Sequence, residues 1–175
     1  MQQSGRPGVA SVADALTLSR LIAAVLAIPL VWNERWTAVA VLLALAWVSD
    51  LLDGRLARAS GSPTRLGAWD MRADTAVGAG LVIGLIGQGS MPAWAGLLAL
   101  TLLGGMFLAG NLAAAMLLQL TGFIPVLVTL WGDRPMVWWL PFAIAVGIGV
   151  ADWRRLFTIN IPAFVRGVAG RFENR

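Results

Sequence analysis

Long apolar runs dominate this chain, separated by short breaks that are polar or rich in glycine and proline. Each run approaches the ~20 residues that an α-helix needs to cross the ~30 Å hydrocarbon core of a bilayer. A helix satisfies its own backbone hydrogen bonds, which hydrocarbon cannot do. The pattern therefore predicts an all-α polytopic membrane protein with six transmembrane helices, at about 15–32, 36–52, 67–87, 92–109, 112–131 and 135–151.

Two parts of this prediction, the turn within 92–131 and the C-terminal tail, do not follow from the apolar runs alone. The stretch 92–131 carries no charge and is twice the length of one span, so we place a turn at Gly110 and Asn111. The predicted membrane domain covers 1–152, and a basic cytoplasmic tail covers 153–175. Asn160 is placed to begin a short amphipathic helix lying along the inner membrane surface. A solvated, frayed terminus fits the same residues equally well.

Composition and charge support a membrane protein. The 175 residues are 58% hydrophobic and 13% charged, a balance typical of polytopic membrane chains. The six-span arrangement places eleven of the thirteen arginines on the side of both termini, leaving Arg35 and Arg134 opposite. The positive-inside rule then predicts cytoplasmic termini in a bacterial-type inner membrane. Because the arginines follow the membrane topology, the net charge of +4 does not indicate a nucleic-acid partner.

The absence of two residue types narrows the chemistry. The chain has no cysteine and no histidine, which excludes thiolate chemistry, histidine acid–base catalysis and the usual zinc ligands. Carboxylates, arginines, hydroxyls and amides remain. Ionisable groups at membrane depth are expensive and usually functional, so the acidic residues near the predicted spans are the first candidates for a site.

Four of the nine acidic residues lie within 25 positions of one another. Asp50 and Asp53 are three apart at the end of the predicted second span, and Asp70 and Asp74 are four apart at the start of the third. Both spacings place the pair on one helix face. A short loop makes the two spans antiparallel neighbours, so the acids face one another. Their repulsion favours a bound divalent cation of the hard, oxygen-preferring kind, Mg²⁺, Mn²⁺ or Ca²⁺.

Small and basic residues accompany the acids. Arg58 and Arg65 offer bidentate donors that suit a phosphate group. Small side chains let a bulky ligand or a second helix approach the backbone. Together with metal-binding acids, these residues indicate a phosphate-bearing substrate. The small residues are Gly54, Ala57, Gly61 and Gly67.

At these positions the sequence resembles the CDP-alcohol phosphatidyltransferases, whose signature is D-x2-D-G-x2-A-R-x8-G-x3-D-x3-D. Only two residues separate Gly67 from Asp70, where the signature has three. The segment 14–20, which contains Thr17, is similar to the N-x-L-T-x-x-R segment of many members, with Asp14 in place of the asparagine. The signature residues present here are Asp50, Asp53, Gly54, Ala57, Arg58, Gly67, Asp70 and Asp74.

The resemblance implies a homodimeric six-span enzyme that uses two Mg²⁺ or Mn²⁺ ions. Such an enzyme transfers a phosphatidyl group from a CDP-linked lipid, such as CDP-diacylglycerol, to a small alcohol and releases CMP at the cytoplasmic face. Asp50, Asp53 and Asp70 would hold the metals, and Asp74 would border them and act as the base. The residues implied to bind substrate are Gly54, Ala57, Arg58, Gly67, Thr17 and Arg65.

The acceptor and two other classes of protein stay open. Glycerol 3-phosphate is the leading acceptor, by resemblance to short bacterial members alone. Members that use this acceptor often have Lys after the last aspartate, where this chain has Thr75. An ion-coupled transporter also carries membrane acids, although these acids lie at one interface rather than at the midplane. A catalytically inactive family member is the third possibility. Several later residues either serve the acceptor or have structural roles: Arg72, Arg154, Arg155, Asn111, Gln119 and Thr121.

Overall fold

The computed structural model describes residues 7–60, 69–133, 135–151 and 162, and within these ranges the chain is all-helical. This confirms the all-α part of the predicted fold class. The helices are α1 (Pro7–Trp32), α2 (Trp36–Ser60), α3 (Asp70–Gln88), α4 (Ala93–Leu108), α5 (Leu112–Asp133) and α6 (Pro135–Ala151).

The helix bounds differ from the predicted spans at the end that carries the acids. α1 begins at Pro7, ahead of the apolar run, and α2 continues to Ser60. Apolar length reports the hydrocarbon-crossing part of a helix, whereas backbone hydrogen bonding continues into the polar region. The third helix begins at Asp70 rather than 67; residues 67–68 lie outside the described ranges, as does the tail 153–175 apart from residue 162.

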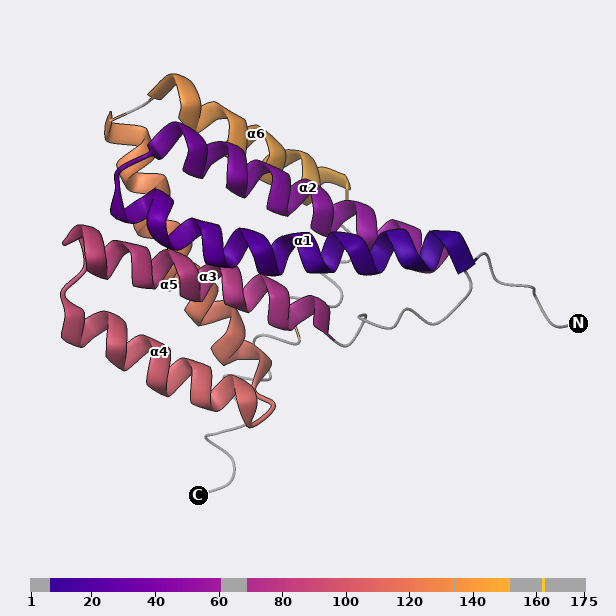
Figure 1. Cartoon of the computed structure of the whole chain (residues 1–175), viewed down its shortest axis with the longest axis horizontal. Coiled ribbons are helices and arrows are strands. Elements are labelled where there is room, and N and C mark those ends of the chain that lie inside the picture. Colours follow the sequence, from indigo (N-terminus) through magenta and orange to yellow (C-terminus); the bar gives the residue numbers. More distant parts are fainter. Residues whose placement is uncertain (1–6, 61–68, 134, 152–161, 163–175) are drawn as a thin grey trace, which may run out of the picture.

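The turns lie at breaks between the apolar runs, as the sequence predicted. Gly110 has φ 90°, a left-handed conformation that suits glycine, and the chain reverses there between α4 and α5, as predicted (Figure 1). Asn111 then caps α5, because its Oδ1 accepts a hydrogen bond from the Ala114 N–H at 3.1 Å. α3 also ends at a glycine in the left-handed conformation, because Gly89 has φ 90°.

The helices form a bundle in which α1 lies between α2 and α3 (Figure 1). α3 packs in addition against α5, α4 packs against α5, and α2 packs against α6. The fully buried core lies among α1, α2, α3 and α5, with Val31, Leu43, Leu81, Leu85 and Leu130 at its centre. This arrangement corrects the prediction that the second and third spans are direct neighbours, because α2 and α3 both pack against α1, which lies between them.

Glycines allow two of these helix pairs to approach closely. A Cβ at Gly80 would overlap the carbonyl oxygen of Ala24, so α1 and α3 are nearly in backbone contact. A Cβ at Gly78 would lie 2.7 Å from the Cα of Gln119, so α3 and α5 are similarly close. Small residues at helix crossings are the usual means of tight packing in membranes.

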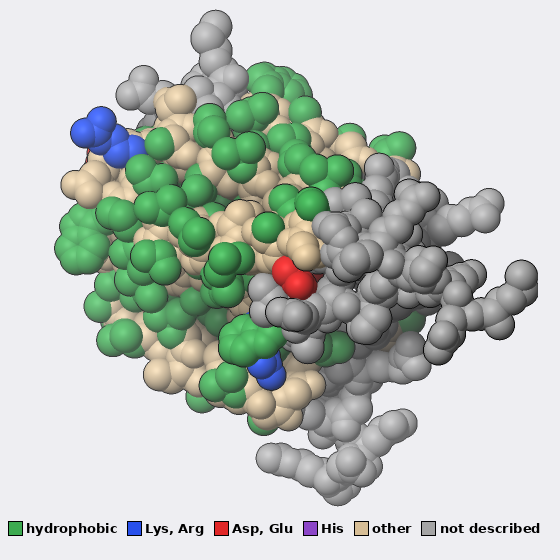
Figure 2. Space-filling model, turned by 45° about the vertical axis from the view of Figure 1, so that its right-hand side comes forward, with side chains coloured by type: hydrophobic (Ala, Val, Ile, Leu, Met, Phe, Trp, Pro, Cys, Tyr) green, Lys and Arg blue, Asp and Glu red, His purple; other side chains and the backbone are tan. Residues whose placement is uncertain are grey.

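Large apolar side chains are exposed along the described helices. Two helical segments, Asp14–Trp32 and Leu112–Gly132, are long and apolar enough to cross a membrane, and Trp36–Leu52 and Ala93–Leu108 are shorter apolar helices. Val25 is 67% exposed and Trp94 is 73% exposed. Hydrophobic side chains cover most of the described face in Figure 2. The number of crossings and the cytoplasmic termini stay predictions.

Candidate functional site

The core-facing side of α1 carries one charged residue among its described buried positions. Buried residues recur along this helix at steps of three and four, which is the repeat of one helix face. Arg20 is part of this face, and its side chain is only 1% exposed. A fully buried arginine requires anionic partners, so this helix face directs attention to the acids opposite it. The face consists of Thr17, Arg20, Ala24, Ala27 and Val31.

The acids continue the core-facing sides of the two neighbouring helices. Asp50 follows the buried Leu43 by seven residues, two helical turns along α2. Asp74 precedes the buried Val77 by three residues on α3, and Asp70 lies one turn earlier. Residues at these spacings share a helix face. Helical periodicity therefore turns all three carboxylates toward α1, where the apolar core ends.

One guanidinium contacts all three carboxylates. Arg20 Nη1 donates to Asp50 Oδ1 at 2.9 Å and to Asp74 Oδ1 at 2.5 Å. Its Nη2 donates to Asp70 Oδ1. The arginine is buried, whereas the side chains of Asp50, Asp70 and Asp74 are 42%, 44% and 32% exposed. Arg20 thus lies on the core side of the acids, which also reach accessible space.

The three acids fit a divalent cation. One oxygen of each carboxylate can be chosen so that all three lie within 4.8 Å of one another. Oxygens on opposite sides of one Mg²⁺ ion lie ~4 Å apart, twice the ~2.1 Å bond length, so only a small adjustment is needed. Carboxylate oxygens are the hard ligands that Mg²⁺ and Mn²⁺ prefer. The partial exposure of the acids gives an ion a way in.

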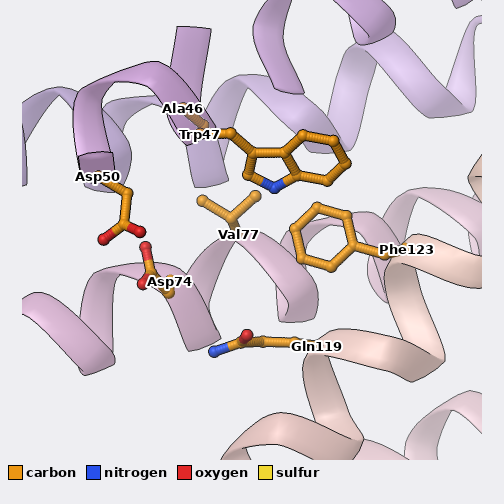
Figure 3. A pocket seen from close by; sticks show the side chains of 7 residues that line it. All are labelled: Ala46, Trp47, Asp50, Asp74, Val77, Gln119 and Phe123. Carbon is orange, nitrogen blue, oxygen red and sulfur yellow. The ribbon is translucent and has the colours of Figure 1, made fainter. Parts of the chain in front are cut away.

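A cavity of about 270 Å³ adjoins the acids and is lined by residues of α2, α3 and α5. Asp50 and Asp74 point toward one another at one end, and the rings of Trp47 and Phe123 close the other end (Figure 3). These rings are 5.5 Å apart between centroids and tilted by 47°. The cavity therefore combines an acidic end with an aromatic wall. Its lining residues are Ala46, Trp47, Asp50, Asp74, Val77, Gln119 and Phe123.

An amide lies between the two ends of this cavity. Gln119 extends from α5 toward the end that Asp74 occupies (Figure 3). Its Nε2 donates to Thr75 Oγ1 at 3.5 Å, a long hydrogen bond, and Thr75 Oγ1 itself donates to the Met71 carbonyl at 2.7 Å. A long bond of this kind is weak, so the amide can exchange it for a bond to a ligand hydroxyl.

The structure brings together some of the predicted site residues and leaves others outside its description. Asp50, Asp70 and Asp74 converge, as the spacing predicted. Thr17 is buried one turn before Arg20 on the same face of α1. The backbones of Asp53, Gly54, Ala57 and Arg58 lie in α2, but their side chains are not described, and Arg65 and Gly67 fall outside the described ranges.

The polar residues with open roles separate into different environments. Gln119 lines the cavity, whereas Asn111 caps α5 and Thr121 donates to the Leu117 carbonyl of its own helix at 2.8 Å. The guanidinium of Arg72 lies 4.8 Å from the ring centroid of Trp69. Arg154 and Arg155 are outside the described ranges.

Sequence reasoning missed three residues of the site. It counted Arg20 only for membrane orientation and as part of the resembling segment 14–20; the signal that could have found it is a charge on the apolar face that includes Ala24 and Ala27. Trp47 and Phe123 gave no signal, because aromatic residues occur throughout such a chain and the meeting of these two rings depends on where the bundle places α2 and α5.

Comparison with known proteins adds one finding. The family model described as CDP-alcohol phosphatidyltransferase matches residues 10–120. The matched region contains Arg20, the three converging acids and Gln119, and it ends before Phe123. Neither a curated protein nor a solved structure gives a match to the chain.

Proposed function

The chain belongs to the CDP-alcohol phosphatidyltransferase family, and we propose that it transfers a phosphatidyl group from a CDP-linked lipid such as CDP-diacylglycerol to an alcohol, releasing CMP. The observation that carries this proposal is the convergence of Asp50, Asp70 and Asp74 beside a cavity with an aromatic wall. Such a cavity suits a reaction between a charged head group and an apolar molecule, at the place where membrane and water meet.

The acids are proposed to hold divalent cations. Asp50, Asp70 and Asp74 would supply carboxylate oxygens, with Asp53 as a further ligand from the next turn of α2. Two ions, Mg²⁺ or Mn²⁺, are the expected number. When bound, they neutralise the phosphate oxygens and stabilise the departing CMP.

Asp74 is proposed to act as the general base. It faces the cavity, where the acceptor hydroxyl would lie between its carboxylate and the Gln119 amide. The hydroxyl oxygen attacks the phosphorus that bears the lipid and forms a new P–O bond. The bond from that phosphorus to the bridging oxygen breaks, CMP leaves with that oxygen, and the hydroxyl proton passes to Asp74. A positioned base of this kind contributes ~10²–10⁴-fold.

The remaining signature residues are proposed to bind the CDP portion. Gly54, Ala57 and Gly67 would let the nucleotide approach the backbone, and Arg58 and Arg65 would donate to its phosphates. Thr17 is the sixth residue that we propose to bind the substrate. Its position on the Arg20 face of α1 supports a place beside the acids.

The surroundings of the reaction are also part of the proposal. We place the active site at the cytoplasmic face of a bacterial-type inner membrane, in a homodimer, with glycerol 3-phosphate as the first acceptor to test. The apolar surface of the described helices supports a membrane location.

Purified full-length protein, incubated with CDP-diacylglycerol, Mn²⁺ or Mg²⁺ and a panel of alcohols, tests the function. CMP release measures the reaction, and mass spectrometry of the lipid product identifies the acceptor. We expect Asp50→Ala and Asp74→Asn to abolish CMP release while the protein still inserts into membranes. Glu34→Gln is the control, because this acid lies in the turn between α1 and α2, away from the cluster.

Three results would reject the proposal. CMP release that is unchanged in both aspartate variants would remove the acids from the reaction. Metal-dependent ion flux across vesicles without CMP release from any donor would indicate a transporter instead. Absence of both activities in a folded wild-type protein would indicate an inactive family member.

A further inference from the structure

We infer that Arg20 is a positioning residue that acts as the internal counter-ion of the acidic cluster, holding the three carboxylates together and limiting their affinity for divalent cations. The inference rests on the proposed function in one respect, because it takes these acids to be the cation site. It concerns a residue of α1 whose guanidinium contacts the ligands and not the reacting atoms.

The geometry makes Arg20 a link between three helices. Its two terminal nitrogens contact Asp50 on α2 and both Asp70 and Asp74 on α3. The planar guanidinium presents several donors in a fixed arrangement, which a lysine ammonium does not. One turn further along α1, Ala24 packs against Gly80 almost in backbone contact. The position of Arg20 along the α1 axis is therefore fixed relative to the two aspartates of α3.

The charges define what this link does. Three carboxylates whose oxygens approach within 4.8 Å repel one another strongly. One guanidinium balances one of the three negative charges that it contacts and leaves two to attract divalent cations. Arg20 therefore keeps the acids converged before an ion arrives. Because it is buried, water and salt screen it poorly, and it opposes every further cation that approaches.

This role differs from that of an arginine that only stabilises the fold. A purely structural arginine would leave the site disordered when removed, and cation binding would weaken. A counter-ion, once removed, leaves the acids on helices that Gly80 and the apolar core still hold in place. The acids then attract a divalent cation more strongly, while the cation-free protein loses stability. The two roles thus predict opposite changes in cation affinity.

The experiment measures Mn²⁺ binding to full-length protein in detergent, without donor lipid, from the electron paramagnetic resonance signal of free Mn²⁺. We expect R20Q to bind Mn²⁺ at least ~10-fold more tightly than wild type, since one opposing charge a few ångströms from the ion is removed. In excess EDTA the same variant should melt at a lower temperature, and Mn²⁺ should raise its melting temperature more than that of wild type.

Two further variants complete the design. R72Q removes the same charge from an exposed arginine near the start of α3 that lies against Trp69, and its Mn²⁺ affinity should stay within ~2-fold of wild type, since solvent screens exposed charges. R20K keeps the charge but holds fewer carboxylate oxygens, so its affinity should lie between those of wild type and R20Q. If R20Q does not fold, R20K decides the question by binding Mn²⁺ more tightly than wild type.

The outcomes separate this inference from the proposed function. If wild type binds Mn²⁺ and R20Q or R20K binds it no more tightly, the counter-ion role is wrong and the transferase proposal stands. If none of the three proteins binds Mn²⁺, the cation site itself is wrong, and both proposals fall. An R72Q effect as large as that of R20Q would show that general surface charge, and not Arg20, sets the affinity.

Discussion

Replacement of Gly78 by alanine tests whether the cavity depends on the close approach of α3 and α5. Gly78 lies one turn after Asp74 on α3, and its added Cβ would lie 2.7 Å from the Cα of Gln119. Ordinary contacts of a Cβ begin at 3.4 Å, so α5 must retreat by ~0.7 Å in a closely packed interior. The retreat carries Gln119 away from Asp74.

The expected magnitudes follow from this displacement. Forcing extra volume into a packed interface costs ~1–3 kcal/mol, while Gly→Ala gains ~1 kcal/mol of helix propensity, so the net loss of stability is modest. Catalysis is more sensitive, because a ~1 Å misplacement can reduce a rate by ~10²-fold. We therefore expect kcat/KM for the acceptor to fall ~10–100-fold in Gly78→Ala, by the same displacement argument.

Gly104→Ala is the matched control. Gly104 lies in α4 with open space around the position of an added Cβ, so the variant has the propensity gain without the collision. CMP release at varied acceptor concentration and thermal unfolding in detergent measure both effects. Gly78→Ala with wild-type kcat/KM and a melting temperature equal to that of Gly104→Ala would refute the idea that this approach positions the site.

Two further variants probe single hydrogen bonds. Gln119→Met keeps the length of the side chain but cannot bond to the acceptor, so we expect the acceptor KM to rise ~10-fold, the equivalent of one net hydrogen bond, with the donor KM unchanged; an equal rise in both KM values would place Gln119 outside the acceptor site. Asn111→Ala removes the cap of α5 and should cost ~1 kcal/mol of stability with CMP release unaffected, whereas loss of activity in a folded protein would return Asn111 to the acceptor pocket.

The sequence predicted the acidic site because the relevant information is local. The spacings of Asp50 to Asp53 and of Asp70 to Asp74 each specify one helix face wherever that helix packs. The expectation that the short connection makes the two spans direct neighbours is wrong, because α1 lies between α2 and α3 (Figure 1). The helix faces predicted from these spacings agree with the convergence of Asp50, Asp70 and Asp74, which meet at Arg20 of α1. The turn at Gly110 was predictable for the same reason, since glycine adopts a left-handed φ at little cost.

The ends of the helices were less predictable. α1 begins at Pro7 and α2 continues to Ser60, beyond the apolar runs that were used to bound them. Hydropathy detects which part of a helix lies in hydrocarbon. It carries little information on how far the hydrogen-bonded backbone extends into water, where polar residues form helices as readily as apolar ones.

The amino-acid sequence by itself determined the helical, membrane-suited character of this protein and the faces on which its acids lie, since both follow from periodicity and composition along one chain. Only the tertiary structure decided what those acids face. Arg20 reaches Asp50 and Asp74 from 30 and 54 positions away, and Trp47 meets Phe123 across α2 and α5. Such pairs depend on how closely helices approach. The glycines that permit this approach contact a neighbouring helix only in the packed bundle, so the sequence alone does not identify that helix.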